Sequence, residues 1–172
     1  MKMNRRNAIK LVGAMALTGS VPKSNAVCST FQTFMQQHAP PSKRPSVAVI
    51  GPPASGKTTV MLDLIKNLYG QRNTVILDYY AEALGTAYPD LDCALINFSE
   101  PFSERLVMDI YQGIRRGTGY RAQIFTTLND TDASHLTIMN YDVTIRTEHI
   151  GNEYTAQVVA NRFGPRSRAY TV

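Results

Sequence analysis

The stretch Ser46-Val-Ala-Val-Ile50-Gly51-Pro-Pro-Ala-Ser-Gly56-Lys57-Thr58 carries the strongest structural signal in this chain. Residues 46–50 are uncharged and rich in β-branched side chains, which is typical of a buried strand in a parallel sheet. Residues 51–58 match the pattern G-x-x-x-x-G-K-[ST] in full. Residues 59–69 then carry apolar side chains at helical spacing, and Gly70 follows them as a C-terminal cap. The stretch therefore predicts a strand, a glycine-rich turn and an amphipathic helix in direct succession.

Residues 51–58 have the chemistry of a phosphate-binding loop. Glycines let backbone N–H groups turn toward an anion, and the start of a helix adds partial positive charge. The ammonium of Lys57 can reach the β- and γ-phosphates of a nucleotide, and the hydroxyl of Thr58 can ligate Mg²⁺. We therefore expect ATP and Mg²⁺ as cofactors. The candidate phosphate-binding residues are Gly51, Pro52, Pro53, Ala54, Ser55, Gly56, Lys57, Thr58 and Thr59.

The overall composition excludes several classes of protein. With 44% apolar and 18% charged residues, the chain is neither disordered, collagenous nor a coiled coil. Two cysteines cannot build a disulfide framework, and the three histidines show no metal-ligand spacing with them. The length of 172 residues fits one domain with an N-terminal arm.

The basic charge of the chain lies in its N-terminal segment. The formal net charge is +5, but residues 1–45 hold seven of the 18 basic residues and none of the 13 acidic ones. Residues 46–172 therefore keep 11 basic and 13 acidic residues, a net charge of −2. We divide the chain accordingly into a basic leader or arm with a proline-rich linker, residues 1–45, and a nucleotide-binding domain, residues 46–172. The charge of this domain gives no general electrostatic case for binding nucleic acid.

The N-terminal segment also has features of a targeting signal. Residues 4–10, Asn-Arg-Arg-Asn-Ala-Ile-Lys, resemble a twin-arginine export signal, although Ala8 stands where that signal usually has a large apolar residue. A weakly apolar run at 11–17 and a candidate cleavage site after Ala26 complete the pattern. The leader would then engage an export system or a membrane, whereas the need for ATP favours a cytoplasmic protein with a basic arm. No stretch reaches the roughly 18–20 apolar residues of a transmembrane helix.

The rest of the chain alternates between strand-like and helix-like segments, which predicts an α/β fold with a mostly parallel sheet. The expected strands are residues 74–78, 93–98 and 123–127, and the expected helix is residues 102–116. Residues 142–147 and 154–160 alternate in polarity on either side of Gly151-Asn152. This pattern predicts an antiparallel C-terminal hairpin.

This order of elements resembles the RecA-like core of P-loop ATPases, in particular the bacterial replicative helicase DnaB and the RadA and KaiC-like proteins. The resemblance covers roughly residues 46–170. Besides the phosphate-binding loop, it rests on Thr126-Thr127-Leu128-Asn129, on Tyr141-Asp142-Val143 and on Asn161-Arg162-Phe163-Gly164-Pro165. It implies Mg²⁺-dependent ATP hydrolysis coupled to DNA, as in a helicase, recombinase or packaging motor, and self-assembly into a ring or filament. Motors of the FtsK/HerA type are close relatives that the sequence hardly distinguishes.

The resemblance also implies roles for single residues. Arg162 would be an arginine finger that reaches the γ-phosphate bound by a neighbouring subunit, where negative charge grows during transfer. The alternative is an exposed arginine at the end of the hairpin. The family has a lysine where this chain has Ala160, and Thr127 or Asn129 stands in for the sensor residue of the family.

The Mg²⁺ side of the expected site departs from the family pattern. Asn97, with Glu100 nearby, stands where the family has a Walker B aspartate, and a neutral amide would hold Mg²⁺ more weakly. Asp78 or Glu82 could replace the catalytic glutamate that polarises the attacking water. Asp78 could equally do no more than end a strand.

Two alternative functions follow from these departures. A small-molecule or nucleotide kinase fits the length of the chain and Asp78 at the end of the second strand, but residues 161–165 are not a kinase feature. A nucleotide-binding regulator that does not hydrolyse ATP fits Asn97 and the missing sensor.

Overall fold

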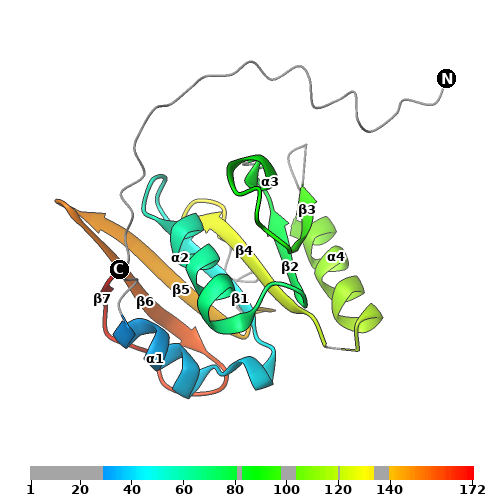
Figure 1. The fold of residues 1–172 in the computed structure, drawn as a ribbon, viewed down its shortest axis with the longest axis horizontal. Coiled ribbons are helices and arrows are strands. Elements are labelled where there is room, and N and C mark those ends of the chain that lie inside the picture. The colour runs from blue at the N-terminus through cyan, green and yellow to red at the C-terminus, as the bar shows by residue number, and fades with distance from the viewer. Residues whose placement is uncertain (1–28, 81–82, 98–103, 120, 134–139) are drawn as a thin grey trace, which may run out of the picture.

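The computed structural model describes residues 29–80, 83–97, 104–119, 121–133 and 140–172 (Figure 1). The predicted export signal and its cleavage site lie outside these residues, as do Glu82 and Glu100. No described helix has both the length and the hydropathy that crossing a membrane requires.

In the described residues, seven strands form one sheet with the order β3-β2-β4-β1-β5-β6-β7. The strands are β1 (Ser46–Gly51), β2 (Thr74–Asp78), β3 (Ala94–Asn97), β4 (Gln123–Asn129), β5 (Val143–Ile150), β6 (Glu153–Asn161) and β7 (Tyr170–Thr171). The first five strands run parallel, whereas β6 is antiparallel to β5 and β7 is antiparallel to β6. The α/β class, the mostly parallel sheet and the C-terminal hairpin are therefore confirmed.

The helical elements lie between these strands and before them. They are α1 (Ser29–His38), η2 (Pro41–Lys43), α2 (Lys57–Leu64), η3 (Ile65–Tyr69), α3 (Leu84–Ala87) and α4 (Glu104–Gly117). The helix predicted over 59–69 is confirmed as α2 and its π-helical continuation η3, and Gly70 follows it with a φ of +83°. The hairpin strands are longer than predicted, with Gly151-Asn152 between them as expected.

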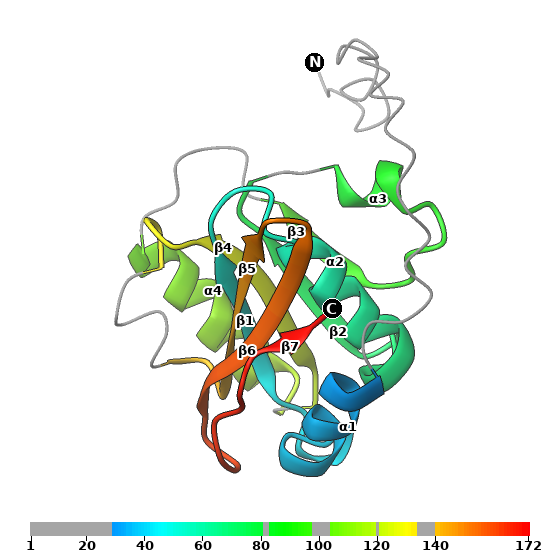
Figure 2. The same cartoon turned by 90° about the vertical axis from the view of Figure 1, so that its left-hand side faces the viewer.

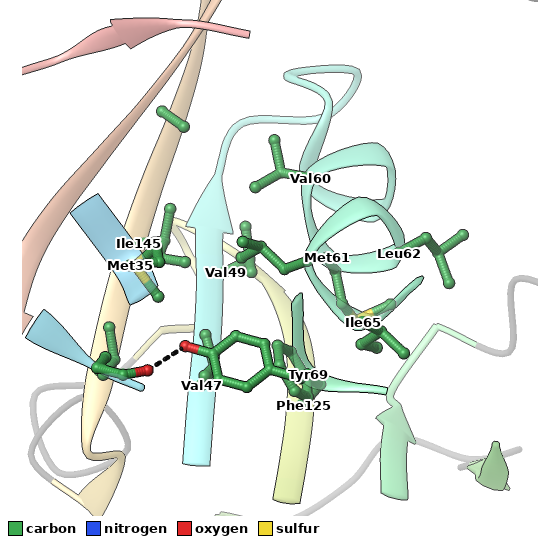
Figure 3. Packing of buried hydrophobic residues seen from close by; sticks show 14 of the residues in the cluster. Met35, Val47, Val49, Val60, Met61, Leu62, Ile65, Tyr69, Phe125 and Ile145 are labelled. Carbon is green, nitrogen blue, oxygen red and sulfur yellow. Dashed lines mark hydrogen bonds between the residues drawn. The ribbon is translucent and has the colours of Figure 1, made fainter. Parts of the chain in front are cut away.

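The sheet separates two hydrophobic clusters, because successive side chains of a strand point to opposite faces. Val47 and Val49 of β1 join the cluster that contains the buried side chains of α1, α2 and η3 (Figure 3). Ala48 and Ile50 join the cluster on the other face, which includes Tyr111 of α4. We call the first the α2 face and the second the α4 face.

The packed domain begins earlier than the predicted boundary at residue 46. Phe31 and Met35 of α1 are fully buried in the same cluster as β1, and the hydroxyl of Tyr69 donates to the carbonyl oxygen of Ala39 at 2.7 Å. Residues 29–45 are therefore part of the domain and not of an arm. Phe31 and Met35 are four residues apart on one face of α1, and this short apolar stripe precedes the prolines that suggested a linker.

Candidate functional site

The phosphate-binding loop connects β1, in the middle of the sheet, to the start of α2. Parallel strands β4 and β5 flank β1, so the loop leaves the sheet at the edge where β1, β2, β4 and β5 all end. We call this the carboxyl edge, and the opposite one the amino edge. The first four N–H groups of a helix have no acceptor within the helix, and the helix dipole is positive there. Lys57 and Thr58 are the first two residues of α2, so their N–H groups belong to this set.

Two positions in the loop require glycine. A Cβ atom at Gly51 would lie 2.7 Å from the hydroxyl oxygens of Ser55 and Thr147, closer than real Cβ contacts come. Gly56, just before α2, has a φ of +84°, a left-handed conformation that other residues rarely adopt. The two glycines therefore set the path of the loop.

Neighbouring strand β5 supports the loop through Thr147, which sequence reasoning missed. The hydroxyls of Ser55 and Thr147 lie 2.7 Å apart, and Thr147 Oγ1 donates to the carbonyl oxygen of Ile50 at 3.3 Å. All of these atoms are buried. The loop is thereby tied to two strands of the sheet, and only the pairing of β5 with β1 brings Thr147 there.

Lys57 is buried although it carries a charge. Its side chain folds back over the loop, its Nζ atom donates to the carbonyl oxygen of Pro52 at 2.8 Å, and the residue is 6% exposed. A bond to a phosphate oxygen would be charge-assisted and therefore stronger than this bond to a neutral carbonyl. Thr58 is partly exposed and Thr59 is exposed beside it. The loop thus presents a cation, backbone donors and hydroxyls at one edge of the sheet.

Asp78 and Thr127 lie at the same edge, on β2 and β4; β4 is next to β1, and β2 is next to β4. Asp78 is the last residue of β2 and is 2% exposed, and Thr127 near the end of β4 is also buried. Thr127 pairs with Val49 of β1. Leu77, which precedes Asp78, pairs with Thr126, which precedes Thr127.

The alternation of the strands places both side chains on the α2 face. Ile76 and Phe125, two residues before Asp78 and Thr127, belong to the cluster that α2 covers. Asp78 and Thr127 therefore share a face with Lys57. Among the predicted catalytic and binding residues, the structure thus brings Asp78 and Thr127 to the same edge and face as residues 51–59.

Hydroxyl groups tie the ends of β2 and β4 to each other. Asn129 donates its backbone N–H to the hydroxyl of Tyr80 at 2.6 Å, and Thr126 Oγ1 donates to the carbonyl oxygen of Leu77 at 3.0 Å. On the α4 face, burial raises the pKa of Tyr79, whose hydroxyl lies 3.4 Å from that of Tyr141. Tyr79 is therefore neutral at physiological pH. These contacts fix the backbone on both sides of Asp78.

Asn97 lies farther from the loop than Asp78 does. It is the last residue of β3, which is the outermost strand on one side of the sheet, and it is exposed. Strands β2 and β4 lie between β3 and β1, and Asn97 pairs with Asp78 in the register of β2 and β3. The carboxylate of Asp78 is thus one strand nearer to the phosphate-binding loop than the amide of Asn97.

Arg162 lies at the opposite edge of the sheet from Lys57. It follows β6, whose last residue Asn161 pairs with Val143 at the start of β5. Its Nη1 atom lies 3.1 Å from Oδ1 of Asp142, and its side chain is 62% exposed. In this chain Arg162 therefore does not approach its own phosphate-binding loop.

Asp142 is the centre of a buried polar cluster at the amino edge. Its Oδ2 atom lies 2.6 Å from Nη2 of Arg115 and accepts hydrogen bonds from the backbone N–H and the hydroxyl of Ser46, both at 2.9 Å. Arg115 is buried and also donates to the carbonyl oxygens of Arg44 and Ala122. This cluster joins the start of β1 to α4 and β5.

A pair of aromatic side chains on the hairpin lies beside the phosphate-binding loop. The rings of His149 and Tyr154 are stacked, with centroids 4.2 Å apart and planes 3° apart. Tyr154 also touches the loop, because a Cβ atom at Gly56 would lie 3.2 Å from its Cδ1 atom. Figure 2 shows the turn between β5 and β6 at the same end of the sheet as the loop between β1 and α2. Sequence reasoning missed this pair, because the register of the hairpin, which sets His149 opposite Tyr154, is needed to find it.

The donor set at the carboxyl edge fits Mg²⁺ bound together with phosphates. Mg²⁺ prefers oxygen ligands and is usually held by one or two protein groups plus phosphate oxygens and water. The hydroxyl of Thr58 and the carboxylate of Asp78 are ligands of this kind, and they lie on the same face of the sheet. The described residues contain no group of three or more histidine, cysteine, aspartate and glutamate side chains that could hold a metal by themselves.

Comparison with known proteins identifies the fold. No family model and no curated protein matches the sequence. The structure is similar to that of a KaiC-like protein from the hyperthermophilic archaeon Pyrococcus horikoshii OT3, with a TM-score of 0.52 and 11% sequence identity. The match covers 75% of this chain and 85% of the archaeal one. The chain thus has a KaiC/RecA-like α/β fold, with a mostly parallel sheet and antiparallel strands at its C-terminal end.

Proposed function

We propose that this chain binds ATP with Mg²⁺ at the carboxyl edge of its sheet and hydrolyses it. The observation that carries the proposal is the buried ammonium of Lys57, folded over a glycine-rich loop between the central strand and the start of α2. A lysine placed this way can donate charge-assisted hydrogen bonds, which are stronger than its bond to the neutral carbonyl of Pro52. A bound triphosphate would accept such bonds.

Binding of the phosphates would exchange one set of partners for another. Nζ of Lys57 would leave the carbonyl oxygen of Pro52 for phosphate oxygens, and the N–H groups at the start of α2 would donate to the same anion. The hydrogen bond between Ser55 and Thr147 holds the loop against β5. Little reorganisation is then needed on binding.

Hydrolysis would take place on the side of the loop that faces β4 and β2. Bound Mg²⁺ would neutralise charge on the phosphates, with the hydroxyl of Thr58 and the carboxylate of Asp78 as its protein ligands. Asp78 would hold the water shell of the metal or orient the attacking water, and Thr127 would hydrogen-bond the terminal phosphate. The burial of both side chains on the α2 face supports these roles, whereas the exposure of Asn97 on the edge strand disfavours it as a ligand.

The role of Arg162 in this proposal depends on a second copy of the chain. Its distance from its own loop is compatible only with action on the nucleotide of a neighbour, as in the ring or filament that the family resemblance implies. The ion pair with Asp142 is exposed on the side of Arg162, so breaking it in an assembly costs little. Coupling to DNA belongs to the same assembly and is proposed from the resemblance.

The test is ATP turnover by the purified protein, measured with and without Mg²⁺ and single-stranded DNA, over a range of protein concentrations. We expect Mg²⁺-dependent turnover that Lys57→Ala abolishes. Lys66→Ala is the matched control, because Lys66 lies at the end of the same helix but its ammonium pairs with Asp90 away from the loop. Equal turnover in the two variants would overturn the proposal.

A second set of variants tests whether Asp78 or Asn97 is the residue that acts with Mg²⁺. Asp78→Asn should remove turnover and keep most of the ATP binding, whereas Asp92→Asn, at an exposed carboxylate, should change neither. Asn97→Asp should also leave turnover unchanged, and a gain there would favour the regulator reading. Phosphorylation of an added acceptor, without ATP hydrolysis or assembly, would favour a kinase.

A further inference from the structure

The stacked pair of His149 and Tyr154 combines two properties that rarely meet by chance. Tyr154 contacts the phosphate-binding loop at Gly56, and yet it is 39% exposed to solvent. His149, on the neighbouring strand, is exposed as well. An aromatic surface thus lies open to solvent directly beside the proposed phosphate site.

The pairing of the hairpin strands explains why both rings lie near the loop. In the β5–β6 register His149 is opposite Tyr154, and Thr147 is opposite Ala156. Ala156 belongs to the cluster on the α2 face, and Thr147 contacts Ser55 of the loop on that face. Side chains two residues apart on a strand point to the same face, so His149 and Tyr154 also lie on the α2 face, two residues nearer the turn than Thr147 and Ala156.

The aromatic pair and the predicted catalytic residues lie on opposite sides of β1. Strands β4 and β2, with Thr127 and Asp78, lie on one side, and the hairpin strands β5 and β6 lie on the other. A triphosphate that crosses β1 with its terminal phosphate toward Asp78 would extend its nucleoside end toward the hairpin. This step rests on the proposed function, because it takes the orientation of the phosphates from it.

We infer that the His149–Tyr154 pair is the surface on which the nucleobase stacks. The ligand is then a nucleoside triphosphate and not a bare polyphosphate, because an exposed aromatic pair lies beside the proposed phosphate site. Every base has a π-face, and stacking on an aromatic side chain contributes substantially to affinity without reading the hydrogen-bonding edge of the base. The hairpin would then have two roles: Thr147 supports the phosphate-binding loop, and His149 and Tyr154 hold the base.

The competing explanation gives Tyr154 a purely mechanical role, in which its ring supports Gly56 and keeps the loop in shape. The two explanations differ in their dependence on the base. Loss of a mechanical support weakens the binding of any ligand that uses the phosphate-binding loop, whereas loss of a stacking surface weakens only ligands that carry a base.

The experiment compares the affinities of ATP and of inorganic tripolyphosphate, each with Mg²⁺, by isothermal titration calorimetry. Tyr154→Ala should lower the affinity for ATP by roughly 5- to 150-fold, the range that follows from removing one base–aromatic stack. Its affinity for tripolyphosphate should stay within about twofold of the unaltered protein, and Tyr154→Phe should keep both affinities because the ring remains. Ile150→Ala, at an exposed residue in the turn of the same hairpin, is the matched control and should change neither.

The outcomes separate failure of this inference from failure of the proposed function. Equal losses for both ligands in Tyr154→Ala, or no loss for either, would overturn the stacking role while the phosphate site stands. Absence of binding of both ligands to the unaltered protein would overturn the phosphate site and the stacking role together. If Tyr154→Ala does not fold, His149→Ala decides instead, because His149 is exposed and its loss should again weaken ATP and spare tripolyphosphate.

Discussion

The two edges of the parallel sheet each bury a positive charge, but they compensate it in different ways. At the amino edge, the guanidinium of Arg115 lies 2.6 Å from the carboxylate of Asp142, which also accepts two hydrogen bonds from Ser46. At the carboxyl edge, the ammonium of Lys57 donates to the neutral carbonyl oxygen of Pro52. The first arrangement centres on a carboxylate, and the second includes a bond to a neutral carbonyl that a phosphate oxygen would surpass in strength.

Under the proposed function, this difference separates a structural charge at Arg115 from a ligand-binding charge at Lys57. A buried ion pair that is fully hydrogen-bonded adds little net stability, but the loss of one partner leaves an uncompensated buried charge. A buried lysine held by a carbonyl can exchange that partner for an anion at small cost. We therefore expect the amino edge to respond to mutation in stability, and the carboxyl edge to respond in ligand affinity.

The largest expected effect is on stability at the amino edge. Asp142→Asn removes the carboxylate that pairs with the buried Arg115 and should lower the free energy of unfolding by about 3–5 kcal/mol. Urea unfolding followed by circular dichroism measures this. Asp130→Asn breaks the exposed pair with Arg146 and should cost no more than about 1 kcal/mol. Equal losses in the two variants would show that the buried cluster is not special.

The next effect concerns the carboxyl edge and its ligand. ATP with Mg²⁺ at one hundred times its dissociation constant should stabilise the unaltered protein by about 2.7 kcal/mol. In Lys57→Ala at the same ATP concentration, about half to nine-tenths of this stabilisation should disappear, because removal of a charged hydrogen bond worth about 1.5–3 kcal/mol weakens binding by roughly 10- to 150-fold. Thermal or urea unfolding with and without ATP gives both values. The prediction fails if ATP stabilises Lys57→Ala as much as it stabilises Lys66→Ala.

A glycine substitution tests how tightly the loop is built. In Gly51→Ala the new methyl group meets the hydroxyls of Ser55 and Thr147 and the backbone of β5, so we expect a loss of about 1–3 kcal/mol in the free energy of unfolding. Gly113→Ala is the opposite case, because nothing lies within 4 Å of its added Cβ atom in α4. A helix favours alanine over glycine by up to about 1 kcal/mol, so this control should gain stability.

The smallest effect on stability is expected at Arg162. The side chain of Arg162 is 62% exposed, and Asp142 keeps its ion pair with Arg115, so Arg162→Ala should lower the free energy of unfolding by less than about 1 kcal/mol. If Arg162 acts on the nucleotide of a neighbour, the same variant should lose most of its turnover at protein concentrations where the unaltered protein assembles. Unchanged turnover at every concentration would limit Arg162 to its pair with Asp142.

Local patterns made most of the fold predictable. The β-branched run at 46–50, the glycine-rich turn and the apolar spacing of 59–69 each reflect interactions within a few residues, and all three elements were predicted correctly. The hairpin followed from polar alternation on either side of Gly151-Asn152 in the same way. Residues 29–45 were misjudged because prolines at 40, 41 and 45 dominate the segment, while the burial of Phe31 depends on partners far along the chain.

The parts of the candidate site that could not be predicted depend on strand order and register. Nothing in the sequence near Asp78 or Asn97 reveals that β2 lies next to β4 and that β3 is at the edge. Thr147 and Tyr154 are more than ninety residues from the loop that they contact, and only the pairing of β5 with β1 and β6 brings them to it. Long-range pairing is set by the packing of the whole domain, which short sequence patterns do not encode.

Val172 offers practical access to the site. It donates its backbone N–H to the carbonyl oxygen of Tyr154 at 2.8 Å, so residue 172 is held beside the residue that lies next to the phosphate-binding loop. A fluorescent dye coupled at position 172 would therefore sit close to any bound nucleotide. Its emission would report ligand binding in real time, with every side chain of the site left unchanged.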